Sequence, residues 1–164
     1  MKKIKSALIS VFYKTGLEDI IRELHKNNVE IYSTGGTQAF IEKLGIPAIA
    51  VEDLTEYPSI LGGRVKTLHP KIFGGLLGTN AKGHKNDLKK EKIVEFDLLV
   101  VNMYPFEETV KNTKTKSKII EMIDIGGHSL IRAAVKNYEK TIHLINPKDY
   151  DYFIKNFPIR PILK

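Results

Sequence analysis

Apolar residues near the N-terminus form a short continuous run that is followed at once by a segment of helical spacing. The run 7–11 is typical of a strand that is buried on both faces of a parallel sheet. After it, Thr15 and Glu18 form a capping-box pattern that predicts the start of a helix. One face of that helix would carry the apolar residues Leu17, Ile20, Ile21 and Leu24.

The same alternation of apolar runs and helical segments continues along the chain. Further strands are predicted over 29–33, 46–51, 96–102 and 141–145. Further helices are predicted from a Thr37 cap to residue 44, over about 129–137, and from residue 149 onward. Strands that alternate with helices predict an α/β fold of three layers, with a mainly parallel sheet and helices on both faces.

Three segments lack this regular pattern. Residues 52–78 contain a strongly basic turn, and residues 81–92 are charged and predict a solvated helix or loop. Residues 111–118 carry four lysines among threonine and serine. We interpret that segment as a solvated loop, because no aromatic residue is interleaved there for base stacking.

The length and composition of the chain fit one compact domain. Of its 164 residues 42% are hydrophobic, and we predict a domain over 1–156 with a C-terminal tail over 157–164. The chain contains no cysteine, which excludes disulfides and thiolate zinc sites. The lysine-rich N-terminus has no apolar stretch typical of a signal peptide, so a cytoplasmic location is expected. A net charge of +7 would suit nucleic acid and phosphorylated metabolites equally.

Polar residues gather where three of the predicted strands end, at 10–14, 33–37 and 102–105. In parallel sheets of this type, ligands bind in crevices beyond the carboxyl ends of the strands. Residues 33–37 read STGGT between a strand and a helix, an arrangement in which backbone N–H groups bind phosphate, although a plain capped turn has the same pattern. No Walker lysine and no G-x-G-x-x-G motif is present, so the triphosphate and dinucleotide fingerprints are missing.

The basic turn over 63–71 reads GRVKTLHPK and holds an arginine, two lysines and a histidine around one proline. A double glycine before it and Pro70 within it indicate a shaped turn rather than a loose one. If the stretch is extended, Arg64 and Lys66 point to the same side. Together with the STGGT loop, this turn predicts a site for a small anionic phosphate ester.

Three further side chains have both a chemical and a structural interpretation. Tyr104 follows the strand over 96–102 and is either a functional phenol or an aromatic residue at the edge of the core. Asp124 precedes a double glycine and is either a turn former or an acid–base group beside free N–H donors. Lys136 would at least complement a helix dipole. The histidines His25, His84 and His143 lack metal-ligand spacing, so no metal site is predicted.

Five segments, in this order, resemble the inosine monophosphate (IMP) cyclohydrolase domain of the bifunctional purine-biosynthesis enzymes. They are SxxxKTG from Ser10, STGGT from Ser33, GRVKTLHPKIFGGLL from Gly63, VVNMYPF from Val100 and IDIGGHSLIRAAVKN from Ile123. The resemblance covers nearly the whole chain, and GRVKTLHPK followed by NxYPF and DIGG is its most specific part. The chain departs from the family at Phe12, Tyr13 and His128, where serine, aspartate and proline are common.

The resemblance implies a methylglyoxal-synthase-like fold and closure of the purine ring of 5-formamidoimidazole-4-carboxamide ribotide to IMP, without cofactor or metal. Lys66 and Tyr104 would assist deprotonation of the attacking nitrogen, and Asp124 with Lys136 would manage protons at the formyl oxygen. The residues implied to hold phosphate and ribose are Ser10, Lys14, Ser33, Thr34, Gly35, Gly36, Thr37 and Arg64. Those implied to line the base are Thr67, Asn102, Gly126 and Gly127.

The resemblance also implies partners. It predicts a homodimer, and a formyltransferase domain that normally lies on the same chain and whose activity is not expected from these residues. Neither nucleic acid nor membrane is an expected partner. The alternatives are a phosphate-eliminating lyase such as methylglyoxal synthase, which does not explain Lys66 and Tyr104, and a nucleotide-sensing regulatory module. A nucleic-acid binder would show a steep salt dependence of binding.

Overall fold

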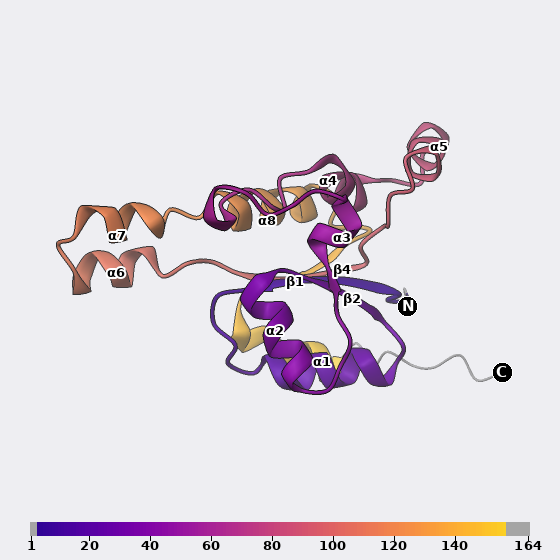
Figure 1. Cartoon of the computed structure of the whole chain (residues 1–164). Coiled ribbons are helices and arrows are strands. Elements are labelled where there is room, and N and C mark those ends of the chain that lie inside the picture. Colours follow the sequence, from indigo (N-terminus) through magenta and orange to yellow (C-terminus); the bar gives the residue numbers. More distant parts are fainter. Residues whose placement is uncertain (1–2, 157–164) are drawn as a thin grey trace.

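A five-stranded parallel sheet forms the centre of the computed structural model, which describes residues 3–156 (Figure 1). Its strands are β1 (Ser6–Val11), β2 (Glu30–Ser33), β3 (Ile49–Ala50), β4 (Leu98–Asn102) and β5 (Ile142–Leu144). They lie in the order β3-β2-β1-β4-β5, and each neighbouring pair is parallel. The predicted tail over 157–164 lies outside the described residues.

Helices cover both faces of this sheet, as Figure 1 shows. One face packs against α1 (Leu17–Lys26), α2 (Gly35–Lys43) and α9 (Tyr150–Asn156). The other packs against α3 (Val51–Thr55), α4 (Pro70–Leu77) and α8 (Ile125–Lys136). Side chains of β1 alternate between the two cores, since Ala7 and Ile9 join the first core and Leu8 joins the second. The predicted three-layer α/β fold is confirmed.

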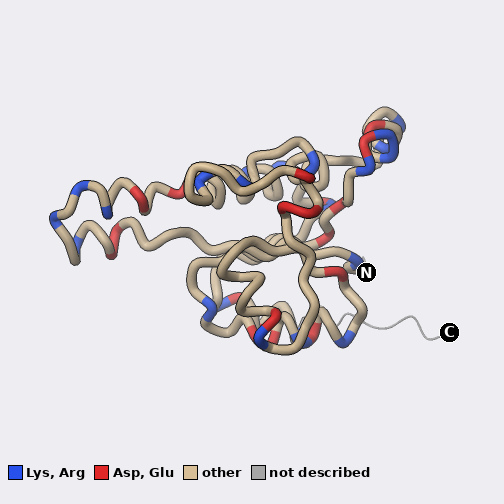
Figure 2. The backbone as a smooth tube through the Cα atoms, viewed as in Figure 1, with Lys and Arg blue, Asp and Glu red and all other residues tan. Residues whose placement is uncertain are grey.

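Three helices extend away from the sheet (Figure 1). They are α5 (Lys82–Lys90) and a hairpin of α6 (Phe106–Asn112) and α7 (Lys116–Glu121). No residue of α6 or α7 is buried. Basic and acidic residues are interspersed along the hairpin (Figure 2). Among the described residues, no helix is long and apolar enough to cross a membrane.

Two of the predicted helix caps are wrong. Gly16, in the left-handed region with φ 71°, precedes α1 and no side chain caps that helix, so Thr15 and Glu18 do not form a capping box. The residue before α2 is Thr34 rather than Thr37. The hydroxyl of Thr37 instead accepts from the Val11 N–H and donates to the Val11 carbonyl, at 3.1 and 3.0 Å, which ties α2 to the end of β1.

Other boundaries differ for local reasons. Strand β3 has two residues instead of the predicted 46–51, because the chain turns into α3 at Val51. Helix α8 begins at Ile125 rather than near 129, because the Asp124 carboxylate caps it. The predicted loop over 111–118 is mostly helical, since α6 and α7 enter it from both sides.

The structure also contains two short 3₁₀ turns. In addition, helix α4 lies in the segment 52–78, for which no regular pattern predicted it. The turns are η1 (Leu61–Gly63) and η2 (Pro147–Asp149). In α4 the first helical residue is Pro70, and the His69 ring accepts a hydrogen bond from the Lys71 N–H at 3.1 Å. Proline at this first position is a known helix-start signal.

The tight packing of α4 makes Gly75→Ala a test of the fold. A Cβ atom at Gly75 would lie 2.3 Å from the Val94 carbonyl oxygen and 2.8 Å from the Phe96 ring. Because the nearest of these atoms belongs to the backbone, we expect the substitution to lower the free energy of unfolding by about 3 kcal/mol, measured by urea denaturation.

A matched control for this prediction is Gly83→Ala in α5. No atom lies within 4 Å of a Cβ placed there, and Gly83 lies inside a helix. Alanine should therefore leave stability unchanged or raise it by up to about 1 kcal/mol. Equal stabilities of the two variants would contradict the described packing of α4 against Val94 and Phe96, which precede β4.

Candidate functional site

The sheet has a switch point at its centre, where the chain order reverses between β1 and β4. In parallel α/β sheets this is where ligands bind. A cavity of about 620 Å³ lies there, bounded by residues that follow β1, β2 and β4, by the basic turn and by the start of α8. The predicted site residues that line it are Ser10, Lys14, Thr34, Gly36, Thr37, Arg64, Lys66, Thr67, Asn102, Tyr104, Asp124, Gly126 and Gly127.

One end of the cavity is an anion-binding arrangement at the start of α2. The N–H groups of Gly35 and Gly36 belong to the first helical turn and have no helical acceptor. The Ser10 and Thr34 hydroxyls are 2.9 Å apart, which joins the end of β1 to this turn. Free N–H groups and hydroxyls at a helix N-terminus favour phosphate.

Two lysines add positive charge to this end. Lys66 is half-buried, and Cβ atoms placed on Gly63 and Gly35 would lie 3.4 and 3.8 Å from its Nζ, so its ammonium lies between the basic turn and α2. The Lys14 ammonium donates to the carbonyls of Val11 and Phe12 at 2.5 and 3.0 Å. Burial lowers the pKa of Lys14. Both lysines therefore line the cavity into which the start of α2 opens.

Asp124 and Tyr104 lie together in the lining of the same cavity. The Asp124 carboxylate accepts from the Gly127 N–H at 2.6 Å, and its second oxygen lies 3.4 Å from the Tyr104 N–H. Burial, and then the charge of Asp124, raise the pKa of the Tyr104 phenol. Tyr104 is consequently a protonated hydrogen-bond donor at neutral pH.

The Asp124 side chain fits only because Gly127 has no side chain. A Cβ atom on Gly127 would lie 2.4 Å from a carboxylate oxygen of Asp124. The start of α8 also approaches the basic turn closely, since a Cβ atom on Gly126 would lie 3.2 Å from the Thr67 hydroxyl. The double glycine thus brings together the carboxylate, the basic turn and a second helix N-terminus.

Arg64 forms an ion pair with Glu121 at the end of α7. Both residues line the cavity, and both side chains are at least half exposed. The sequence analysis did not single out Glu121, and no local signal could have found it, because the pair joins positions 57 residues apart. Glu121 competes with any anionic ligand for the guanidinium of Arg64.

We therefore expect Glu121→Gln to strengthen the binding of ribose 5-phosphate about two- to fourfold at low salt, and less at high salt, where exposed charges are screened. Isothermal titration calorimetry would measure the change. A matched control is Glu18→Gln, which removes the same charge from the Arg22–Glu18 ion pair, at 2.7 Å, on α1. The same gain in both variants would show a general charge effect and contradict the competition.

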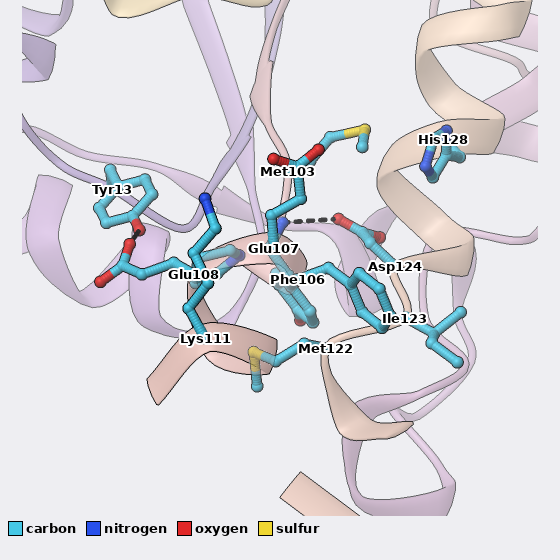
Figure 3. A pocket seen from close by; sticks show the side chains of 12 residues that line it. Tyr13, Met103, Phe106, Glu107, Glu108, Lys111, Met122, Ile123, Asp124 and His128 are labelled. Atoms are coloured by element: carbon cyan, nitrogen blue, oxygen red, sulfur yellow. Dashed lines mark hydrogen bonds between the residues drawn. The ribbon is translucent and has the colours of Figure 1, made fainter. Parts of the chain in front are cut away.

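A second, more apolar cavity of about 720 Å³ adjoins the first (Figure 3). The two cavities share Tyr104, Ile123 and Asp124. Figure 3 shows Phe106, Met122 and other side chains of the α6–α7 region around it. The family departures lie at this junction: Tyr13 and His128 line the second cavity, and the rings of Phe12 and Tyr104 meet edge to face with centroids 5.5 Å apart.

Three predicted site residues do not line the first cavity. Ser33 is fully buried and its hydroxyl donates to the Ile9 carbonyl at 2.8 Å. Gly35 begins α2 just beside the cavity. Lys136 is exposed in the last turn of α8, about 14 Å along the helix axis from Gly127 at 1.5 Å per residue. The cavity of a single chain is thus formed without the Lys136 side chain.

No cluster of three or more histidine, aspartate or glutamate side chains suited to a metal ion occurs among the described residues. The polar groups of the site are instead mostly lysine, arginine, hydroxyl and backbone N–H donors, with the two carboxylates of Glu121 and Asp124, the first of which is paired with Arg64. This donor set suits an anionic ligand.

Fold and site together define an α/β domain with a cavity at the switch point of its sheet, and the chain belongs to the family of MGS-like domains, whose model matches residues 16–129. It is 55% identical over 150 residues to the "Bifunctional purine biosynthesis protein PurH" of Bacteroides thetaiotaomicron, and 50% identical over 151 residues to that of Corynebacterium glutamicum. These alignments cover 91% and 92% of the chain but only 30% and 29% of those proteins. A solved structure described as ForH superposes with a TM-score of 0.82 at 27% identity, over 96% of this chain and 81% of that one.

Proposed function

We propose that this chain is an IMP cyclohydrolase domain, which closes the purine ring of 5-formamidoimidazole-4-carboxamide ribotide and releases water. The observation that carries the proposal is the presence of Lys66, Tyr104 and Asp124 around the same cavity as a helix N-terminus suited to phosphate. The similarity to PurH proteins supports it.

Ring closure joins two groups of one molecule. The carboxamide nitrogen attacks the formyl carbon, the new C–N bond forms, and the formyl oxygen becomes a hydroxyl. That oxygen then leaves as water with one proton from the attacking nitrogen and one from the formamido nitrogen. A site for this reaction must hold the substrate folded, exchange protons, and stabilise charge on the formyl oxygen.

The residues around the cavity match these requirements. With the phosphate at the start of α2 beside Lys14, the base would extend toward Tyr104 and Asp124. Lys66, in its neutral amine form, would accept a proton from the attacking nitrogen, and the Tyr104 phenol would donate a hydrogen bond that orients the carboxamide. Asp124 would exchange protons at the formyl oxygen, where the N-terminus of α8 favours negative charge. The proposal assigns no proton transfer to Lys136 within its own chain.

The direct test is to mix the purified domain with the formylated carboxamide ribotide and to follow IMP formation by absorbance. We expect turnover well above the spontaneous rate. Folded protein, judged by circular dichroism, that gave only the spontaneous rate would overturn the proposal.

We also propose that the domain acts as a homodimer in the cytoplasm and that the formyltransferase activity lies on a separate domain. The chain spans about 30% of the length of the PurH proteins it matches, which leaves room in them for a second domain. Apolar side chains are exposed on the α6–α7 hairpin and just after it, namely Phe106, Val110, Ile120 and Ile123. Sedimentation that showed only monomer at assay concentration would contradict the dimer.

A further inference from the structure

Asn102, the last residue of β4, uses its side chain for the main chain of the neighbouring loop. Its carbonyl oxygen accepts from the N–H groups of Phe12 and Tyr13 at 2.6 and 3.0 Å. Its amide nitrogen donates to the Tyr13 carbonyl at 2.9 Å. An amide oxygen has two acceptor positions, and both are occupied here.

The loop that Asn102 holds is the one that presents Lys14. Phe12 and Tyr13 follow β1 directly, and Lys14 comes next with its ammonium turned back to the carbonyls of Val11 and Phe12. An ammonium group has three donors, so one donor of Lys14 remains for a ligand in the cavity. The position of that donor depends on the backbone that Asn102 fixes.

A second element supports the Asn102 side chain. Tyr150, the first residue of α9, is buried, and its hydroxyl has no hydrogen bond of normal geometry within the described part of the chain. Burial raises the pKa of Tyr150, while the neighbouring Asn102 side chain lowers it. Tyr150 also lies against Gly16, where a Cβ atom would meet its ring at 3.4 Å. Tyr150 thus lies beside Asn102 and beside Gly16, which closely follows Lys14.

We propose that Asn102 is a positioning residue that sets the phosphate affinity of the site by holding residues 12–14. The inference rests on the proposed function for the identity of the ligand. Removal of the Asn102 amide would leave two backbone N–H groups and one carbonyl without their partners at the same time, and the loop over 12–14 would no longer be held in place.

The test compares ligands that differ only in the phosphate. Asn102→Leu keeps the size of the side chain and removes its hydrogen bonds, and Asn102→Ser is a smaller change in case the first variant fails to fold. We expect the substitution to weaken IMP binding about tenfold and to change inosine binding less than about twofold, measured by NMR titration. A loss shared by both ligands would show a direct contact with the base and overturn the inference.

A double-mutant cycle with Lys14→Ala tests the route of the effect. If Asn102 acts by placing Lys14, Asn102→Leu should weaken phosphate binding little or not at all in the Lys14→Ala background. Full additivity of the two losses would contradict the proposal. Turnover should follow the same pattern, as a rise in KM with little change in kcat.

Ribose 5-phosphate separates this inference from the proposed function. If the wild-type domain binds ribose 5-phosphate but forms no IMP, the cyclohydrolase proposal fails, and the same two variants still test the role of Asn102 with this probe. If the wild-type domain binds neither IMP nor ribose 5-phosphate, the cavity holds no phosphate and the positioning role is refuted as well.

Discussion

Lys66→Ala is expected to lower the rate of IMP formation at least about a hundredfold, because general acid–base groups typically contribute about 10²- to 10⁴-fold. The Lys66 ammonium lies between the basic turn and the start of α2, next to Gly63 and Gly35. Its loss removes from the cavity the group proposed for proton transfer, which carries a positive charge while it is protonated. The measurement is single-turnover kinetics with saturating ribotide, so that weaker binding does not hide the chemical step.

Two variants separate the roles of charge and proton transfer. Lys66→Arg keeps the positive charge but cannot lose its proton near neutral pH, so it should restore IMP binding and leave turnover low. Lys71→Ala is the matched control, because Lys71 belongs to the same basic turn, pairs with Glu56 at 3.3 Å and does not line the cavity. Full turnover in Lys66→Ala would remove Lys66 from the mechanism.

Local patterns in the sequence were sufficient to predict the central strands and the edge of the sheet where the cavity lies. Strand β4 is a continuous apolar run whose side chains enter both cores, and a short run of this kind is typical of a central strand in a parallel sheet. The carboxyl ends of β1, β2 and β4 meet at one edge in any parallel sheet, so their polar residues had to converge. Tyr104 follows β4 and Lys14 follows β1, so both lie at this edge and line the same cavity.

Local sequence patterns could not predict the features that depend on contacts between distant residues. The helices α6 and α7 have only seven and six residues, which is too short for a helical period to stand out in the sequence. The role of Thr37 depends on Val11, which lies in another element. Lys136 was placed at the site by resemblance alone, and only the length and direction of α8 show that its side chain lies far from the cavity.

Both helix starts at the cavity differ from the prediction, since α8 begins at Ile125 rather than near 129 and α2 follows Thr34 rather than a Thr37 cap. At α8 the Asp124 carboxylate caps the helix through the Gly127 N–H, three residues further on, so this cap depends only on residues that are close in the sequence. At α2 no side chain caps the helix, and the first N–H groups are left for a ligand. A helix start without a protein cap, facing a cavity lined by cations, is thus a stronger indication of function than a capped one.

Asp124→Asn is expected to lower the rate of IMP formation about 10²- to 10³-fold while it leaves the free energy of unfolding within about 1 kcal/mol of the wild-type value. Asparagine caps helices as well as aspartate does, so the bond to the Gly127 N–H can persist, but the amide cannot exchange a proton at the formyl oxygen. Burial is the larger cause of the raised pKa of Tyr104, so that phenol stays protonated at neutral pH in the variant and the loss belongs to Asp124. Gly127→Ala is the companion variant: its Cβ atom would push the carboxylate away without removing its charge, and both activity and stability should fall. If Asp124→Asn turned over at the wild-type rate, Asp124 would be a helix cap and not a proton-transfer group.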